Sequence, residues 1–239
     1  MSAVTLPRIE SAGMDGWLVR LFGVIDEANM PWILALVRDC EAAFGDALVD
    51  LVPSYTTLLV VFDIDRLTPA QARLQLQRVL ASLTPDQQLK HAEIQELPTW
   101  YDPSVGPELE RLAEQAGMSC ADVVECHSGA IYQVYALGFA PGFAFMGSVD
   151  ERLAMSRLKT PRKRVPAGSV GIAGRQTAAY PMASPGGWNL IGRTAAMLFD
   201  RKREGFSLLQ AGDRVRFVSV SKEEFVRLGG STLAVEETS

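Results

Sequence analysis

The spacing of apolar residues predicts two helices in the first hundred residues. After Glu27, apolar side chains recur every three or four positions, at Met30, Ile33, Val37, Cys40 and Phe44. Such spacing puts one apolar stripe on a helix. Pro31 falls in the first turn of this helix, where a missing N–H does no harm. A second stripe of the same kind predicts a helix over residues 69–83.

Short apolar runs around these stripes predict strands. The runs lie at residues 16–22, 47–52, 57–62 and, with less regular alternation, 90–97. Together with the helices they give the order β-α-β-β-α-β, which is the ferredoxin-like pattern. The sequence therefore predicts a small α+β domain over residues 1–100.

The segment 101–106, Tyr-Asp-Pro-Ser-Val-Gly, predicts a joint that leads into a second domain over residues 101–239. Two short helices are expected at 107–116 and 119–127, the second capped by Ser119 because Asp122 stands three residues on. From Ala130 onward, strand-like runs alternate with dense glycine and proline. A closing strand then follows Asp213, and a helical turn covers 222–228. Many short strands joined by such turns indicate a mainly-β barrel or sandwich.

Composition and charge argue against several classes of protein. The 239 residues are 48% hydrophobic and carry a net charge of −5, and an acidic chain lacks the basic footprint of a dedicated nucleic-acid binder. No apolar run reaches the length of a membrane span, and the N-terminus does not have the pattern of a signal peptide. The three scattered cysteines suit a reducing cytoplasm. Two histidines without a CxxC motif argue against a Cys/His zinc site.

One stretch has the spacing of a phosphate loop. From Gly187 the chain reads G-x-x-x-x-G-R-T, a Walker A pattern with Arg193 in place of the lysine. Its interior, Trp-Asn-Leu-Ile, is bulky, no buried strand precedes it and no convincing helix follows, so we reject this interpretation. Two alternatives stay open. The stretch is a Pro-Gly-Gly turn that leads into a strand with Trp188 packed, or the rigid, planar guanidinium of Arg193 binds an anion.

Other side chains leave a structural and a functional interpretation open. Ser169, in AGSVG, is one substitution from a nucleophile elbow, but its β-rich surroundings argue against that role. His127 is either a helix-end histidine bonded to carbonyls or a general acid or base. Cys126, beside it, is expected to be a small buried hydrophobe. The basic run 157–164 is either a solvated loop or an anion-binding loop.

Two long motifs, GFAPGFAFMG and TPRKRVPAGSVGIAGRQTAAYPMASPGGWNLIGRT, closely resemble one family. It is the family of the 5-oxoprolinase B subunit, also called KipI-like or allophanate hydrolase subunit 1. With its flanking blocks the resemblance covers about residues 14–228. It implies a small α+β domain followed by a cyclophilin-like β-barrel. It also implies a protein that opens 5-oxo-L-proline to L-glutamate with ATP hydrolysis, in a complex with a KipA-like partner and a LamB/YcsF-like partner.

The resemblance also implies site residues, each carried over at its own position. Catalytic roles are implied for His127, Arg162 and Arg193. Substrate or anion binding is implied for Gly168, Gln176, Tyr180, Gly186, Gly187 and Trp188. Arg164, in the basic run, is added as an anion-binding residue because the chemistry needs cations. Four further residues are expected to shape the pocket: Phe139, Pro141, Gly142 and Pro166. The family commonly has a proline where this chain has Ser156, so the loop before Arg157 loses the fixed φ of proline.

Opening a lactam amide through an activated oxygen requires cations and amide donors more than a nucleophile. We therefore expect arginines and glycine-turn amides to converge on an oxyanion, in a chain that is inactive without its partner proteins. The ATP site is left open between this chain, a partner and an interface. Two other functions also stay open. One is a regulatory protein that inhibits a sensor histidine kinase, and the other is half of a biotin-dependent, urea carboxylase-like carboxyltransferase.

Overall fold

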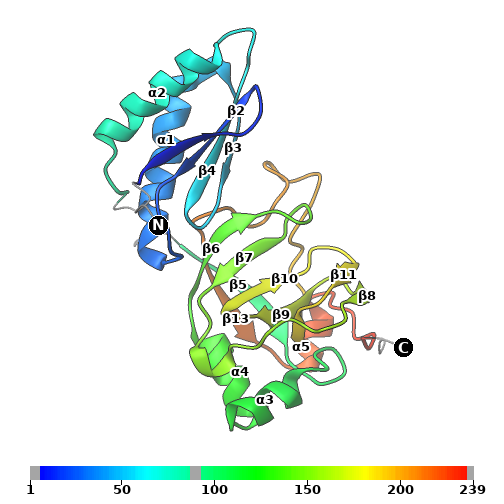
Figure 1. Cartoon of the computed structure of the whole chain (residues 1–239). Helices are drawn as coiled ribbons and strands as arrows, with labels where there is room; N and C mark the ends of the chain where they lie inside the picture. Colours follow the sequence, from blue (N-terminus) through cyan, green and yellow to red (C-terminus); the bar gives the residue numbers. More distant parts are fainter. Residues whose placement is uncertain (1–5, 87–92, 236–239) are drawn as a thin grey trace. The chain divides into compact units, whose positions relative to one another are not determined.

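The N-terminal unit is an antiparallel sheet with two helices packed on one face (Figure 1). The computed structural model describes residues 6–86 and 93–235, and the chain divides into two units between Ala92 and Glu93. The sheet has the order β1-β2-β4-β3. Its strands are β1 (Arg8–Ser11), β2 (Gly16–Arg20), β3 (Leu48–Pro53) and β4 (Thr57–Phe62).

The two helices confirm the predicted apolar stripes. They are α1 (Met30–Phe44), which follows a 3-10 turn at Glu27–Asn29, and α2 (Pro69–Ser82). Pro31 stands in the first turn of α1, and Thr68 caps α2 in a capping box with Gln71. The stripes and the covered sheet face share one core, which contains Val19, Leu36, Cys40, Phe44, Leu58, Val60, Phe62, Ala72, Leu76 and Val79.

The predicted ferredoxin-like order is wrong in its last strand. Of the predicted run, residues 90–92 lie outside the described residues, and Ile94–Trp100 forms β5, which belongs to the C-terminal barrel. There β5 pairs in parallel with β13 (Arg214–Ser219) over six positions and buries Leu97 in the barrel core. The fourth strand of the N-terminal sheet is instead β1, which forms a hairpin with β2. The order is therefore β-β-α-β-β-α.

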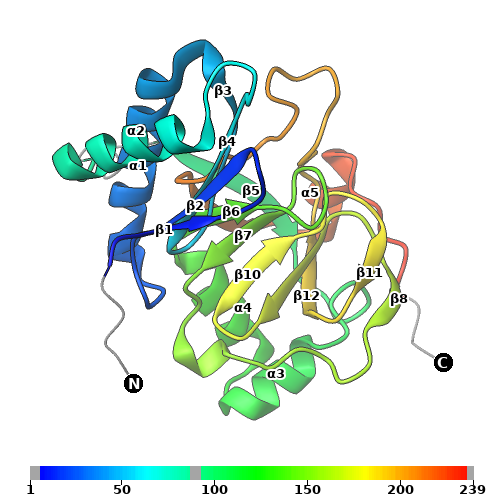
Figure 2. The ribbon, with the colours of Figure 1, turned by 45° about the horizontal axis from the view of Figure 1, so that its top comes forward.

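The C-terminal unit contains a closed barrel with the strand order β10-β7-β6-β13-β5-β12-β9 (Figure 2). Besides β5 and β13, its strands are β6 (Tyr132–Leu137), β7 (Ala144–Gly147), β9 (Ser169–Ala173), β10 (Gln176–Ala179) and β12 (Asn189–Thr194). The predicted strand after Asp213 does close the barrel, because β13 bridges β6 and β5. This confirms the mainly-β second half.

Within residues 93–235, three helices accompany the barrel: α3 (Leu109–Ala116), α4 (Cys120–Gly129) and α5 (Lys222–Arg227), with a 3-10 turn at Glu151–Leu153. Ser119 caps α4 in a capping box with Asp122, as predicted. Leu112 and Val123, from α3 and α4, join the barrel core with strand residues such as Ile172 and Phe217. Among the described residues, no helix is long and apolar enough to cross a membrane.

A second, smaller core lies between the barrel strands and a two-stranded sheet. That sheet pairs β8 (Arg162–Val165) with β11 (Ser184–Gly186), which Figure 2 draws close to β12. The small core combines Phe143, Val165, Ala173, Ala178, Tyr180, Trp188, Leu190 and Val235. The glycine-rich motifs of the sequence build this layer, so the expected site residues of those motifs, though not His127, lie in and around it.

Candidate functional site

The stretch with phosphate-loop spacing is a strand. Asn189–Thr194 is β12, which pairs with β9 and with β5, and Trp188, just before it, is buried. A phosphate loop needs a helix directly after the loop, and the described residues after Thr194 form none there. Rejecting the Walker interpretation was therefore correct. Of the structural alternative, the strand and the packed Trp188 are confirmed, but Pro185 and Gly186 belong to strand β11 and do not form the predicted turn.

Arg193, in β12, has a buried guanidinium that is only partly satisfied. The residue is 1% exposed. Its Nη1 donates to the carbonyl oxygens of Ser231 (2.7 Å) and Leu233 (2.6 Å). Its Nε and Nη2 are buried and have no hydrogen-bond partner among the described residues. Burial lowers the pKa of this guanidinium, because loss of water disfavours the charged form.

Ser169 lies directly across the sheet from Arg193. The two residues are paired in the antiparallel register of β9 and β12, which places their side chains on one face at a Cβ separation of about 5 Å. Ser169 is fully buried, and its Oγ also lacks a partner within the described part of the chain. It begins a strand that continues into β10, not into the helix of a nucleophile elbow. The sequence pattern argued against a role for Ser169; only the cross-strand register reveals its place beside Arg193.

A cavity of about 390 Å³ borders Arg193. It is lined by Arg164, Pro166, Ala167, Ala183, Arg193, Ser231, Leu233 and Ala234. The lining thus combines two arginines with small apolar side chains and contains no acidic residue of the described chain. Three of the predicted residues, Arg164, Pro166 and Arg193, meet here, and Gly168 packs against Arg193 beside them.

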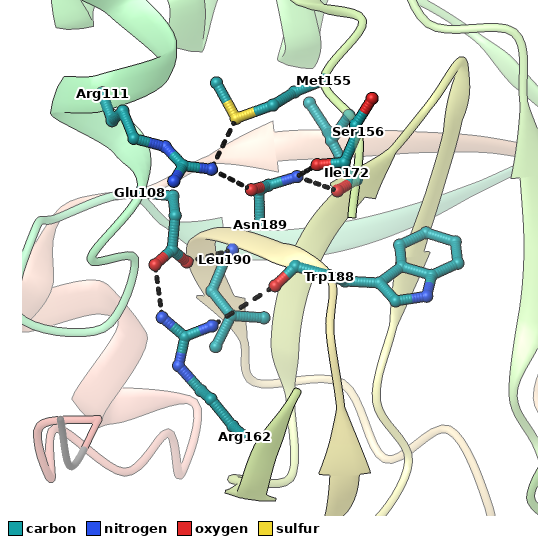
Figure 3. Close-up of polar contacts among 9 residues, drawn as sticks. All are labelled: Glu108, Arg111, Met155, Ser156, Arg162, Ile172, Trp188, Asn189 and Leu190. Carbon is teal, nitrogen blue, oxygen red and sulfur yellow. Dashed lines mark hydrogen bonds and ion pairs between the residues drawn. The ribbon is translucent and has the colours of Figure 1, made fainter. Parts of the chain in front are cut away.

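Arg162 is committed to a buried ion pair (Figure 3). Its Nη2 donates to Glu108 Oε1 and its Nη1 to the Trp188 carbonyl at 3.4 Å. The second carboxylate oxygen of Glu108 accepts the Leu190 N–H at 2.8 Å. Both charged side chains are at least nine-tenths buried. The pair therefore joins β8, β12 and the start of α3 from within the fold.

A second polar cluster in Figure 3 surrounds Asn189. Asn189 Oδ1 accepts from Arg111 Nη2 at 2.6 Å. Its Nδ2 donates to the carbonyls of Ser156 (2.9 Å) and Ile172 (3.0 Å). The loop that lacks the family's proline is thus held through the Ser156 carbonyl. Sequence reasoning missed Glu108, Arg111 and Asn189. The one signal in the sequence was Asn189 itself, a polar residue at the start of the buried strand β12.

His127 lies in the barrel interior. It is fully buried and its ring stacks near Tyr132 and Phe217, with centroids 5.2 and 4.7 Å away. Nδ1 is 2.8 Å from Tyr101 Oη and Nε2 is 2.9 Å from Thr177 Oγ1. Thr177 Oγ1 donates to the Gly171 carbonyl, so it accepts from Nε2–H, and Nδ1 accepts the Tyr101 hydroxyl proton. Burial lowers the pKa of His127 to about 3.

These bonds assign His127 as a neutral imidazole with one tautomer. The residue is not bonded to helix-terminal carbonyls, as the structural alternative expected, nor is it among the residues that line the Arg193 cavity. Cys126, its neighbour, is partly buried and receives a bond from Arg152 at 3.7 Å. Burial is the main cause that raises the pKa of this thiol.

Aromatic residues of the predicted site form the small core. Tyr180 and Trp188 pack edge-to-face on Phe143, at centroid distances of 5.2 and 5.8 Å. Phe139 is 64% exposed with φ +70 and still contacts Phe143 and Tyr180. Burial raises the pKa of Tyr180 to about 12. This cluster is a packed wall and explains why the motif is rich in aromatic residues.

The remaining predicted residues are dispersed. Gly142 packs against Leu198 and Phe199, and the preceding residue, Pro141, is exposed. The Gly187 carbonyl accepts the Leu158 N–H at 2.7 Å, and Gly186 borders the Tyr180 hydroxyl. Gln176 begins β10 opposite Gly147 and Ala173. The structure thus gathers Arg193, Arg164, Pro166 and Gly168, and it places Arg162 and His127 in separate buried networks.

Comparisons with known proteins agree with this architecture. A family model described as carboxyltransferase domain, subdomain C and D, matches residues 7–209. The B subunit of the 5-oxoprolinase of Bacillus subtilis (strain 168) is 34% identical over 228 residues, which cover 91% of this chain and 95% of that protein.

Two solved structures share the fold. The crystal structure of TTHA0988 superposes with a TM-score of 0.75 at 37% identity, over 87% of this chain and 40% of that one, so this chain spans less than half of that protein. The Kluyveromyces lactis urea carboxylase superposes with a TM-score of 0.71 at 21% identity, over 92% of this chain and 22% of that chain. The extent of the family match and the nearly full-length bacterial relative together show that this chain belongs to the family of 5-oxoprolinase B subunits.

Proposed function

We propose that this chain is the B subunit of an ATP-dependent 5-oxoprolinase that opens 5-oxo-L-proline to L-glutamate. The observation that carries the proposal is the 34% identity to a 5-oxoprolinase B subunit along 95% of that protein. We further propose a KipA-like protein and a LamB/YcsF-like protein as partners, a cytoplasmic location, a cyclophilin-like barrel, and no activity of this chain alone.

Within the chain, we propose that Arg193 is the residue that acts on the ligand. It is the predicted arginine that combines burial, unpaired donors and a neighbouring cavity. Arg164 lines the same cavity and Gly168 leaves room for the arginine stem. Arg162 and His127 act as positioning residues in this proposal, because the hydrogen bonds that each makes are to groups inside the protein.

The described residues do not fit ATP at this cavity. A triphosphate with its magnesium ion needs several phosphate donors and carboxylate or water ligands for the metal. The cavity offers two arginines and no acid, and no group of three or more His, Cys, Asp or Glu side chains suited to a metal occurs among residues 6–86 and 93–235. We therefore propose that ATP binds on a partner protein or at an interface with one.

The test is reconstitution. Purified chain is mixed with a candidate KipA-like protein and a candidate LamB/YcsF-like protein, and glutamate formation from 5-oxo-L-proline is measured with and without ATP. We expect ATP-dependent glutamate only when all three proteins are present, with each single omission as a control. Absence of glutamate from a mixture that forms a stable complex would refute the assignment.

The carboxyltransferase alternative has support from the family model, which is described as a carboxyltransferase domain and matches residues 7–209. The urea carboxylase match adds the fold alone, because it is 21% identical. The same reconstitution distinguishes it. A biotin-dependent activity would require a biotinylated carrier, and avidin would abolish it. We expect glutamate formation to be insensitive to avidin.

A further inference from the structure

The guanidinium of Arg193 leaves one particular edge unused. Nη1 is held by the carbonyls of Ser231 and Leu233, and the two nitrogens without partners among the described residues are Nε and Nη2. Nε–H and one Nη2–H point the same way along one edge of the planar group. Two parallel donors of this kind match the two oxygens of a carboxylate in a bidentate contact.

The surroundings of this edge favour an anion, and Arg193 is the buried cation it would neutralise, because Arg164, the other arginine of the lining, is exposed. Among the described residues Arg193 has no ion pair, although it is 1% exposed. A buried cation without a counter-charge is costly, and an anion that binds beside it removes much of that cost. Ser169 Oγ, across the strand pair, adds a buried hydroxyl that also lacks a partner in the described part of the chain.

The cavity walls favour a compact apolar body. Pro166, Ala167, Ala183, Leu233 and Ala234 provide the apolar lining of a space of about 390 Å³. That volume lies at the lower end of the range for small-molecule pockets, about 300–1,000 Å³. Charges of a ligand that lie away from the two arginines would face these apolar walls.

We propose that the cavity beside Arg193 binds a small monocarboxylate with a compact, largely apolar body, whose carboxylate is held by Nε and Nη2 of Arg193 and by Ser169 Oγ. The inference rests on the proposed function only in that 5-oxo-L-proline, a five-membered lactam with one carboxylate, is a ligand of this class. It assigns Arg193 to the carboxylate of the ligand, not to a phosphate.

The C-terminal segment 231–235 forms one wall of this site. Two of its carbonyls hold Arg193 Nη1, and Ser231, Leu233 and Ala234 line the cavity. Val235 enters the small aromatic core and its N–H donates to the Ser104 carbonyl at 3.0 Å. Nε and Nη2 are shielded from solvent, so a ligand that binds them must displace the groups that cover them.

Direct binding to the full chain tests the proposal without any partner protein. Calorimetry would compare cyclopentanecarboxylate, 5-oxo-L-proline, the neutral lactam 2-pyrrolidinone, inorganic phosphate and ATP. We expect both carboxylates to bind and 2-pyrrolidinone to bind at least about tenfold more weakly, because it lacks the charged acceptor. Phosphate or ATP binding more tightly than the carboxylates, or equal binding of all five, would overturn the proposal.

Three variants locate the site. Arg193→Lys keeps the charge but loses the parallel donors, so carboxylate affinity should fall by about tenfold or more. Ser169→Ala should weaken it by about three- to tenfold without lowering the urea midpoint, since the lost hydroxyl has no described partner. Ala183→Leu fills the cavity from an exposed position and should abolish binding. This variant keeps the site testable if Arg193→Lys does not fold. Arg175→Gln, which breaks an exposed ion pair with Glu151, is the matched control.

The last residues of the chain include Glu236 and Glu237, which lie outside the described residues. The double variant Glu236→Gln/Glu237→Gln removes them as competing carboxylates. Carboxylate binding that appears only in this variant would overturn the proposal, since the chain would supply its own anion. Unchanged or tighter binding supports a site for an external ligand.

The outcomes separate this inference from the proposed function. If cyclopentanecarboxylate binds through Arg193 but the reconstituted complex forms no glutamate, the site stands and the functional assignment fails. If the complex forms glutamate and Arg193→Lys leaves its KM for 5-oxo-L-proline unchanged, the function stands and this inference is wrong.

Discussion

Gly168 makes room for Arg193. A Cβ atom at position 168 would lie 3.1 Å from Arg193 Cγ and 2.5 Å from the Thr194 carbonyl oxygen, and the residue has φ +79. Both the left-handed backbone and the close approach therefore require glycine. The side chain of Arg193 fits here only because Gly168, which lies against it, has no side chain.

Gly168→Ala should consequently destabilise the fold and displace Arg193. We expect a loss of about 2–4 kcal/mol, from a left-handed alanine and a contact with backbone that cannot move away. Urea unfolding measures it. Gly174→Ala is the matched control, because Gly174 also has a positive φ but, apart from its chain neighbours, no described atom lies within 4 Å of its Cβ position. That control should lose only about 1 kcal/mol, and equal losses at both sites would contradict the packing argument.

Gly186 stands in the same relation to the buried Tyr180. A Cβ at 186 would lie 2.2 Å from the Tyr180 hydroxyl oxygen, whereas at Gly187 the nearest atom would be 3.6 Å away. We expect Gly186→Ala to cost about 1–3 kcal/mol and Gly187→Ala to stay within about 0.5 kcal/mol. In a Tyr180→Phe background the cost of Gly186→Ala should shrink, as a double-mutant cycle would measure. A cost that is the same in both backgrounds would exclude the hydroxyl as its cause.

The Glu108–Arg162 pair should behave as one structural unit. Removing either partner leaves the other buried and unpaired, so Glu108→Gln or Arg162→Met should each cost about 3–5 kcal/mol. The double variant should cost less than the sum of the two. Chemical denaturation measures these free energies of unfolding. The control is Arg216→Met, which breaks an exposed ion pair with Glu96, because an exposed pair contributes little to stability. Single variants with wild-type stability would argue that Arg162 is free to act on a ligand.

His127 should make stability depend on pH below neutrality. Its folded-state pKa is lowered from 6.5 to about 3, so between these values the unfolded chain binds a proton that the folded chain does not. Stability is complete above about pH 6.5 and falls as the pH drops towards 3, by up to about 1.4 kcal/mol per pH unit.

The measurement compares the slope of unfolding free energy against pH for wild type, His127→Gln and His91→Gln. Carboxylates contribute to all three proteins, so the difference in slope isolates the histidine. We expect the slope between pH 4 and 6 to decrease in His127→Gln and to persist in His91→Gln, the chain's other histidine. An unchanged slope in His127→Gln would mean that the pKa of His127 is not lowered in the folded protein. The imidazole could then exchange protons, which would support an acid–base role.

Local sequence patterns were sufficient for elements whose signals lie within a few residues. The three- and four-residue spacing located α1 and α2, and Ser119 with Asp122 located the start of α4. Density of glycine and proline indicated the mainly-β second half. Strand β1 was missed because four residues, Arg-Ile-Glu-Ser, carry too little periodicity.

Assignments that depend on distant partners were beyond such patterns. Strand β5 follows the N-terminal unit in sequence, yet its ladder is formed with β13, some 120 residues later. The site shows the same limit. Arg162 and Arg193 lie in one motif and were given the same role, but Glu108 pairs with the first and no described acid pairs with the second.

The sequence by itself determined the family, the helices α1, α2 and α4, and the β-rich second half, because motif identity and periodicity are properties of neighbouring residues. Only the tertiary structure decided which strand closes the barrel, which arginine is neutralised and which faces a cavity, and that His127 is sealed in the core. The physical reason is that strand register, burial and charge pairing are set by residues brought together from distant parts of the chain.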